Sequence, residues 1–503
     1  MIATGADRYD AVIVGGGHNA LTAAAYLARA GQRVLLLERL DVLGGAAISA
    51  PAFEGVDARL SRYSYLVSLL PRQIIDDLDL SVQLVRRTYA SYTPDPHDGG
   101  RSGFLARTDD FADFGALCAS VTGAVWDSML APLPTRSQLR TGAWTELIET
   151  PIGEVIRAAT PDDLQRGVLL TDALIGTFAS ADEPSLQQNI CFLYHQLNPW
   201  DVPIGGMGTV TGSLESSARR HGVELRTGAE VLAINPDGEV RYRIGDEERF
   251  AVGTHILSGV TPAVLARLLG ENPPSGQPGA QVKVNLLLNR LPRLRDENVT
   301  PEQAFGGTFH INETYTQLEN AYRQASLGQI PDPLPCEIYC HSLADPSILS
   351  PELRASGAQT LTVFGLHTPH GLPATREQLQ DAVLASLNSV LAEPITDVLA
   401  TDSQGRPCIE TKTTADIEDA LGMTAGNIFH GGLHWPFAED DEPLDTPARR
   451  WGVATDHERI LLCGSGSRRG GGVSGLGGYH AAMAVLETRR SVQATGFSPT
   501  DRG

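Results

Sequence analysis

The residues most suggestive of chemistry lie in the segment GGGHNA, Gly15 to Ala20, near the start of the 503-residue chain. They fit the pattern G-x-G-x-x-G/A, in which Gly15 allows a tight turn and Gly17 lets the backbone approach a pyrophosphate. Ala20 permits close packing of a helix on a strand, and the helix N-terminus would bind the anion. Glu38 follows Gly15 by 23 positions and is placed to accept hydrogen bonds from ribose hydroxyls. The pattern therefore predicts a bound dinucleotide.

His18 and Asn19 occupy the first turn of the predicted helix, beside the expected pyrophosphate. Polar side chains at helix N-termini often satisfy free N–H groups, so the main interpretation is structural support, including support of the chain after Gly44-Gly45. Direct contact with a phosphate or flavin and a role of His18 as a catalytic base are the alternatives.

Hydrophobic runs and turns around these residues predict the elements that position them. Ala11 to Val14 and Arg33 to Glu38 are predicted strands that flank an alanine-rich helix ended by Gly31. Val223 to Arg226 and Val231 to Ile234 are predicted as a strand pair, and the segment RFAVGTHILSGV as a further pair. The segment RILLCGSGSRRGGGVSGLGGYHAAMAVLETRR repeats the order strand, glycine turn, helix.

The predicted fold class is α/β, with a discontinuous Rossmann-type cofactor domain built from residues 1–60, 200–270 and 445–490. Leucines at helical spacing predict a mostly helical insertion over residues 61–199. Apolar strand-like runs predict an α+β substrate domain with a mixed or antiparallel sheet over residues 271–444. Residues 491–503 are predicted to be a loose tail.

The composition of the chain argues against several classes of binding partner. The chain has 39 Lys+Arg against 60 Asp+Glu, a formal charge of -21, which would repel nucleic acid. Six scattered cysteines form neither a disulfide framework nor a zinc-ligand pattern. No apolar run reaches the ~20 residues of a membrane span, and no signal peptide precedes the first strand. We therefore expect a soluble cytoplasmic protein, for which peripheral contact with a membrane stays open.

The segment after the second strand identifies the cofactor by resemblance. Glu38-Arg39, four residues and then Gly44-Gly45-Ala46 resemble flavoproteins of the phytoene desaturase and amine oxidase superfamily, in which the double glycine brings backbone near the pyrophosphate and the flavin. The segments GGGHNAL and GNIFHGG are most similar to the phytoene-desaturase-like branch that includes pyridine nucleotide-disulfide oxidoreductase domain proteins. The resemblance implies FAD. Thiol chemistry is not expected, because the cysteines have neither C-x-x-C nor C-x4-C spacing.

Two later blocks extend the resemblance. In VPIGGMGTVTG, Gly206 and Met207 match backbone that passes near the flavin ring, and Val231 matches a residue that contacts adenine through its backbone. The segment CGSGSRRGGGVSG resembles the family's C-terminal flavin-binding block, in which the helix that follows would stabilise a reduced flavin. The flavin-binding residues implied by this block are Gly464, Ser465, Gly472, Val473 and Gly475.

One departure from the family concerns the substrate. A Thr-His-Pro-like segment is usual before the last glycines, whereas this chain has Ser467-Arg468-Arg469. The two guanidinium groups could bind a substrate carboxylate or hold charge at the flavin, or they could pair with the acidic segment from Glu439 to Pro443. Catalytic candidates are Arg468 together with the predicted pocket-wall residues His430 and His434. No metal site is predicted, because Gly431-Gly432 between the two histidines argues against a helix presenting both.

These observations favour an FAD-dependent oxidoreductase that dehydrogenates or desaturates a moderately hydrophobic small molecule by hydride transfer to flavin. The substrate would be isoprenoid-like or, if the arginines bind it, carboxylate-bearing. The alternatives are an amine or amino-acid oxidase that produces hydrogen peroxide, and a flavin isomerase without net redox. The least favoured is a flavin-free prenyl-binding escort protein of the same fold.

Overall fold

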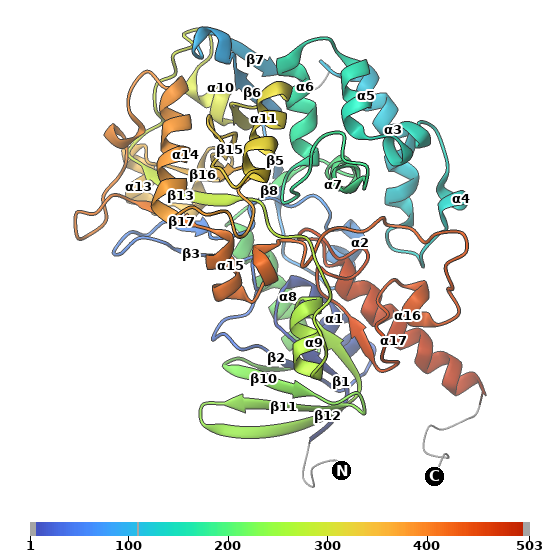
Figure 1. Ribbon diagram of the computed structural model, residues 1–503. Helices are drawn as coiled ribbons and strands as arrows, with labels where there is room; N and C mark the ends of the chain where they lie inside the picture. Colours follow the sequence, from blue (N-terminus) through green and yellow to red (C-terminus); the bar gives the residue numbers. More distant parts are fainter. Residues whose placement is uncertain (1–6, 108–109, 496–503) are drawn as a thin grey trace.

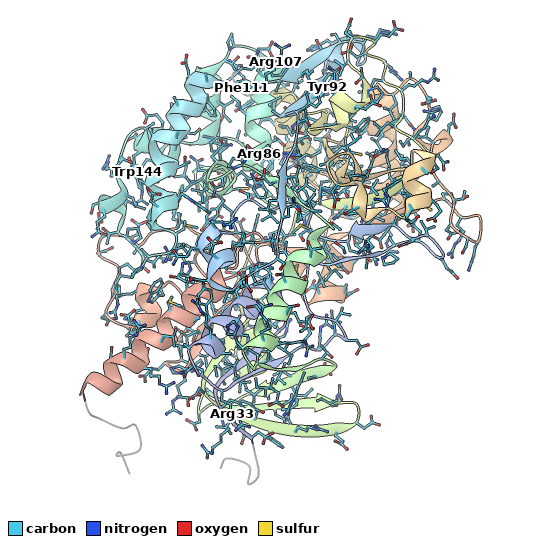
Figure 2. All side chains as sticks on the ribbon, turned by 180° about the vertical axis from the view of Figure 1, so that it is seen from behind. Arg33, Arg86, Tyr92, Arg107, Phe111 and Trp144 are labelled. Atoms are coloured by element: carbon cyan, nitrogen blue, oxygen red, sulfur yellow. The ribbon has the colours of Figure 1, made fainter. Side chains whose placement is uncertain are left out.

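Two seven-stranded sheets organise the residues that the computed structural model describes, 7–107 and 110–495. One sheet lies near the two ends of the chain and the second lies at the opposite end of the molecule (Figure 1). Figure 2 shows the same separation, with Arg33 beside the first sheet and Tyr92 in the second. Trp144 lies in the helical part beside the second sheet (Figure 2).

The first sheet has the strand order β10-β11-β12-β1-β2-β9, and β18 pairs with β12. Strand β1 is parallel to both β2 and β12, and its residues Ala11 to Val14 are buried, as expected of a central parallel strand. The strands are β1 (Asp7–Val14), β2 (Val34–Leu37), β9 (Glu224–Arg226), β10 (Ala229–Ile234), β11 (Glu239–Ile244), β12 (Glu247–Ser258) and β18 (Ile460–Leu462).

The strand pairing corrects two sequence predictions. The segments predicted as one pair are separated, because β9 pairs with β2 and β10 pairs with β11. The segment predicted as a further pair is one continuous strand, β12, which joins the antiparallel strand β11 to the parallel strand β1. The sheet thus draws its strands from three separated ranges, 7–37, 224–258 and 460–462. The domain boundaries themselves stay a prediction.

Three helices pack together beside the first sheet. They are α1 (His18–Arg29), α8 (Met207–Arg220) and α17 (Leu476–Thr495), and a fourth helix, α9 (Pro262–Leu269), follows β12. Helices α1 and α17 approach closely, since a Cβ atom on Gly478 would lie 1.8 Å from the Asn19 carbonyl oxygen. Helix α17 runs to Thr495, so the predicted loose tail begins inside a helix, and residues 496–503 lie outside the described residues.

The second sheet has the order β17-β13-β16-β15-β14-β6-β7 and is antiparallel except between β6 and β14. Its strands are β6 (Ser91–Pro94), β7 (Gly103–Ala106), β13 (Val282–Leu288), β14 (Thr308–Ile311), β15 (Cys336–Tyr339), β16 (Gln359–Gly365) and β17 (Ile409–Lys412). Strands β6 and β7 belong to the range predicted as a mostly helical insertion. That prediction missed them because each strand has only four residues.

The two faces of the second sheet differ in polarity, because successive side chains of a strand point to opposite faces. One face carries Val282, Val284, Phe309 and Ile338, which form one hydrophobic cluster with residues of helix α14 (Arg376–Val390). The alternate positions, which share the other face, are polar yet buried: Lys283, Asn285, Thr308, His310, Glu337, Tyr339, Thr360 and Thr362. Burying these polar side chains is costly unless each of them has a hydrogen-bond partner.

The remaining elements surround these sheets. Helices α2 (Arg72–Asp77), α3 (Ala112–Ser128), α4 (Arg136–Leu139), α5 (Ile152–Ala159), α6 (Asp163–Leu170) and α7 (Gln187–Gln196) come from the insertion. The others are α10 (Pro301–Phe305), α11 (Tyr315–Ser326), α12 (His341–Ala344), α13 (Pro351–Ser356), α15 (Thr414–Leu421) and α16 (Pro447–Arg450). Two small sheets pair β3 (Ser49–Pro51) with β4 (Arg59–Ser61) and β5 (Leu84–Arg86) with β8 (Asp201–Pro203). Among the described residues, no helix combines the length and apolar character needed to cross a membrane.

Candidate cofactor site

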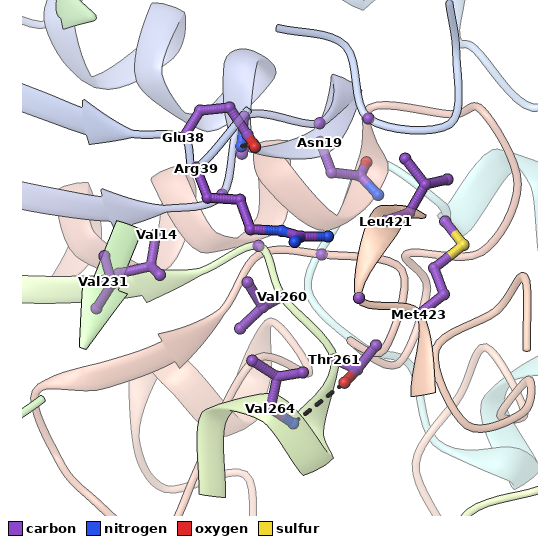
Figure 3. A pocket seen from close by; sticks show the side chains of 18 of the residues that line it. Val14, Asn19, Glu38, Arg39, Val231, Val260, Thr261, Val264, Leu421 and Met423 are labelled. Atoms are coloured by element: carbon purple, nitrogen blue, oxygen red, sulfur yellow. Dashed lines mark hydrogen bonds between the residues drawn. The ribbon is translucent and has the colours of Figure 1, made fainter. Parts of the chain in front are cut away.

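A pocket of about 350 Å³ lies at the carboxyl ends of β1, β2 and β12 (Figure 3). The site predicted from sequence contributes much of its lining: Gly15, Gly17, His18, Asn19, Ala20, Glu38, Arg39, Gly45, Ala46, Val231, His430, Gly464 and Ser465. This volume is within the range of small-molecule sites, roughly 300–1,000 Å³. In open parallel sheets, ligands bind outside the carboxyl ends of the strands.

The glycine turn lines the pocket with backbone that carries no side chains. Gly15 has φ +94°, a left-handed conformation that favours glycine, and Gly17 begins helix α1 without a side-chain cap. A Cβ atom on Gly17 would meet no protein atom within 4 Å. The first-turn N–H groups of the helix are therefore accessible to an anion.

The double glycine after β2 packs against this turn. The Gly44 N–H donates to the Gly16 carbonyl at 2.9 Å, and Gly44 has φ +121°. A Cβ atom on Gly44 would lie 2.9 Å from the Thr211 Oγ1 of helix α8, so a side chain has no room there. Gly44 thus supports the pocket from behind, whereas Gly45 and Ala46 line it.

Glu38 immediately follows β2 and is only 8% exposed. Its Oε2 accepts the Gly16 N–H at 2.7 Å and its Oε1 accepts the Leu40 N–H at 2.8 Å. The carboxylate therefore fixes the glycine turn, and because each oxygen has a second lone pair it can still accept from a ligand in the pocket.

His18 and Asn19 connect helix α1 to the C-terminal glycine loop. The Asn19 Nδ2 donates to the Gly470 carbonyl, and the His18 Nε2 lies 2.9 Å from the Gly472 carbonyl. A carbonyl only accepts hydrogen bonds, so this Nε2 carries a proton. Burial lowers the pKa of His18 to about 4, although the bond to Gly472 opposes this effect. These two bonds hold the loop 470–472 against helix α1, and neither of them reaches the chain after Gly44-Gly45.

We expect Asn19→Asp to destabilise the protein by about 2–3 kcal/mol. Asn19 is 3% exposed, and the substitution would place a carboxylate oxygen against the Gly470 carbonyl in place of a donor. Urea unfolding of purified protein measures the change. Asn289→Asp is the matched control, because Asn289 makes the same kind of bond to the Leu399 carbonyl while exposed to solvent. Equally small losses in both variants would contradict a supporting role of Asn19.

Other predicted cofactor residues lie away from this pocket. Gly206 begins helix α8 with φ +82°, next to Ser49, and Met207 is completely buried. Gly472 and Gly475 have positive φ, and they and Val473 belong to the loop before α17. Helix α17 begins at Leu476, whose N–H is accepted by Ser474 Oγ. His18 and Asn19 connect this loop to α1, whereas Gly206 and Met207 do not line the pocket.

The two arginines are held by protein groups. Arg468 forms an ion pair with Glu442, Nη2 to Oε1 at 2.8 Å, and donates to the Phe437 carbonyl. Arg469 is 1% exposed and donates to the carbonyls of Ser128 and Ala131. Among the described residues, Arg468 thus pairs with the predicted acidic segment, Glu439 to Pro443, whereas Arg469 binds backbone carbonyls. Neither arginine lines the pocket.

We expect Arg468→Ala to lower the free energy of unfolding by less than about 1 kcal/mol, because both partners of the ion pair are partly exposed. Glu442→Gln should give a similar loss, and the double variant should lose no more than either single variant. Urea unfolding of the four proteins tests this. If Arg468→Ala has a large effect and Glu442→Gln has none, the ion pair does not explain the role of Arg468.

The two candidate histidines are in different surroundings. His430 lines the pocket with φ +63°, and burial lowers its pKa to about 4, with a further contribution from His18. Its Nδ1 is buried and has no partner among the described residues. His434 does not line the pocket. Of the two histidines, only His430 lines the pocket.

Sequence reasoning missed one wall of the pocket, formed by Gly259, Val260, Thr261 and Val264 (Figure 3). Thr261 Oγ1 accepts the Val264 N–H at 3.1 Å and so begins helix α9. The signal was the segment SGVTP directly after β12, a strand end followed by glycine and a helix start. Met423 and Leu421 complete the opposite side from a distant part of the chain.

These features fit a dinucleotide. The first turn of α1 offers N–H groups, the Gly17 position leaves open space, and the buried Asn19 Oδ1 has no partner among the described residues. Such a donor set, with a buried carboxylate at the end of the second strand, suits a pyrophosphate and an adjoining ribose.

Comparisons with known proteins agree with this geometry. Residues 13–71 match the NAD(P)-binding Rossmann-like domain family. The uncharacterized protein Rv0897c of Mycobacterium tuberculosis is 59% identical, with 95% of this chain and 97% of that protein covered. The rat pyridine nucleotide-disulfide oxidoreductase domain-containing protein 2 is 27% identical, with 96% and 94% covered. Among solved structures, a mutant of putrescine oxidase is similar with a TM-score of 0.55 and 16% identity, covering 97% of this chain and all of that chain.

Proposed function

Because the chain belongs to the family of the Mycobacterium tuberculosis protein Rv0897c, within the flavin-type oxidoreductase superfamily, we propose that it is an FAD-dependent enzyme that takes hydride from a small molecule. The substrate is dehydrogenated at a C–C or C–N bond. The observation that carries the proposal is the pocket, in which an open glycine turn, an uncapped helix N-terminus and Glu38 meet.

Named residues would hold the cofactor. The N–H groups at the start of α1 would bind the pyrophosphate, Glu38 would bind the ribose, and the backbone at Val231 would contact the adenine. Gly45, Ala46, Gly464 and Ser465 line the remainder of the pocket. Bound FAD supplies a two-electron acceptor for the substrate's hydride. The chain's own part is to exclude water and to orient the substrate, for which the buried interior beside the second sheet offers room.

We further propose that the protein acts in the cytoplasm. All six cysteines are free and buried, which suits a reducing compartment.

The first test identifies the cofactor of the purified full-length chain. We expect a yellow protein that releases FAD on denaturation, in a ratio close to one per chain. A colourless protein without releasable flavin would overturn the proposal and favour the escort alternative.

The second test is an anaerobic titration of the flavin's visible band with extracts of the source cells. Bleaching by an organic-solvent extract would support a lipid-like substrate and desaturation. Bleaching by an aqueous extract would support a polar substrate. If an extract compound is isomerised while the band stays unchanged, the function is isomerisation. Amine oxidation is the second candidate, favoured by the acidic cavity described next.

A further inference from the structure

A second cavity, of about 220 Å³, lies on the polar face of the second sheet, apart from the cofactor pocket. Strands β6, β14 and β15 supply alternate residues to it, and β14 and β15 are paired so that His310 lies opposite Glu337. Helix α7 and a single helical turn, Thr171–Ala173, close the other side. Its polar lining includes Arg87, Asp172, His195, His310, Glu337 and Tyr339.

Glu337 is the most unusual group of this cavity. It is 2% exposed, its Oε1 accepts the Tyr339 hydroxyl, and its Oε2 has no partner among the described residues. Burial raises the pKa of Glu337 to about 8, although the nearby His310 opposes this effect. A buried carboxyl group with an unused oxygen is costly unless something else binds it.

Two carboxyl groups of the cavity, Asp172 and Glu337, have no ion-pair partner among the described residues, and burial raises the pKa of both. His310 Nδ1 lies 2.8 Å from Glu313 Oε2, so these two groups balance each other. Asp172 accepts the Gln196 amide and has no cationic partner within ion-pair distance among the described residues. Arg87 donates to Thr308 Oγ1 and lies over the Tyr339 ring at 5.5 Å. The basic groups that line the cavity with these two carboxyl groups are Arg87, His195 and His310.

The chain also connects this cavity to the cofactor pocket. Ser64 donates to the carbonyl of Ala46, which lines the cofactor pocket. The next residue, Tyr65, lines the second cavity and packs on Tyr339 with the ring centroids 4.5 Å apart. Tyr65 thus lies in the second cavity next to a residue that is hydrogen-bonded to the wall of the cofactor pocket.

We propose that this cavity binds the ammonium group of a small aliphatic amine, with Glu337 and Asp172 as the recognising carboxylates. The ring of Tyr65 adds cation–π attraction, and Leu66, Val168, Ile175 and Trp200 receive the short apolar part. The cavity is smaller than the roughly 300–1,000 Å³ of drug-sized ligand sites, which restricts the ligand to a few carbons. That the amine is the substrate rests on the proposed function, whereas its binding does not.

The test is calorimetric titration of the full-length protein, as purified, with n-butylammonium chloride. We expect one site per chain. Glu337→Gln and Asp172→Asn should each weaken binding at least tenfold, whereas Glu302→Gln, the same change at an exposed glutamate of α10, should not alter it. Binding near pH 7 should also release about one proton from Glu337, measured by repeating the titration in buffers of different ionisation enthalpy. A purely structural role of Glu337 would release none.

Neutral and anionic probes of the same size decide the ligand class. 1-Butanol should bind at least tenfold more weakly than n-butylammonium, and butyrate should bind more weakly still. Butyrate binding as tight as that of the amine would mean that Arg87 recognises an anion and would overturn the proposal, as would the absence of amine binding. The visible band of the same samples reports flavin separately. Amine binding without flavin would reject the proposed function alone, and flavin without amine binding would reject this cavity's assignment alone.

Discussion

Gly17→Ala is expected to abolish flavin binding, with at least a hundredfold loss of affinity, while the protein stays folded. Gly17 has φ −72°, which alanine adopts without strain, and its Cβ would touch no protein atom within 4 Å. The methyl group would instead project into the pocket, where the backbone must approach the pyrophosphate. Flavin content after purification and rebinding of added FAD measure the loss.

Gly212→Ala is the matched control for Gly17→Ala. Gly212 lies inside α8, and its Cβ would also meet nothing within 4 Å. This variant should keep its flavin and gain about 0.5–1 kcal/mol from helix propensity. The Gly17 variant should differ from the flavin-free wild type by less than about 1 kcal/mol, the usual cost of alanine at a helix N-cap. A soluble Gly17→Ala protein with a full complement of flavin would show that the pyrophosphate does not lie on this turn.

Acidification from pH 6.5 to 5 is expected to lower the free energy of unfolding by on the order of 4 kcal/mol. Burial lowers the pKa of His341 and His367 to about 3 and holds the pKa of His480 well below its ordinary range. All three are less than 9% exposed. Between pH 6.5 and 5 these histidines become protonated in the unfolded chain but stay neutral in the folded protein. The free energy of unfolding therefore falls as the pH falls.

Glu337 opposes this loss, as does His310, whose pKa Glu313 raises against the effect of burial. Burial raises the pKa of Glu337 to about 8, so between pH 8 and its unfolded value the folded state binds the extra proton. That contribution offsets about one histidine. His18 and His430, whose pKa burial lowers to about 4, add to the loss, and the expected total includes these contributions. Guanidinium unfolding at pH 7.5, 6.5, 5.5 and 5 measures the dependence. His341→Gln should reduce its slope by about 1.4 kcal/mol per pH unit. Constant stability between pH 6.5 and 5 would mean that these histidines are not buried in the neutral form.

The amino-acid sequence by itself determined the cofactor turn. A strand, three glycines, a helix and a carboxylate after the next strand are close together in the chain, so local geometry alone brings Gly15, Gly17 and Glu38 to the wall of one pocket. The same local information located the strands of the first sheet except β11, although it divided β12 in two and paired β9 with β10. Strand pairing depends on neighbours that are remote in sequence, which local patterns do not specify.

Only the tertiary structure decided the partners of the polar side chains. His18 and Asn19 could have contacted a phosphate, but the close crossing of α1 and α17 brings residues 470–472 within reach of both. Arg468 could have faced a substrate, but the segment that contains Glu442 folds over it. Which acceptor each of these side chains binds depends on which one the folded chain places nearest to it.

For the second cavity, too, the sequence predicts part of the arrangement and the tertiary structure supplies the rest. Alternation in TFHI and CEIY already places His310 and Glu337 on one face of their strands. The sequence does not reveal that β14 and β15 are neighbours, that β6 joins them from the insertion, or that Asp172 closes over them. A face becomes a binding site only when chain segments far apart exclude water from it together, because burial makes an unpaired carboxyl group costly.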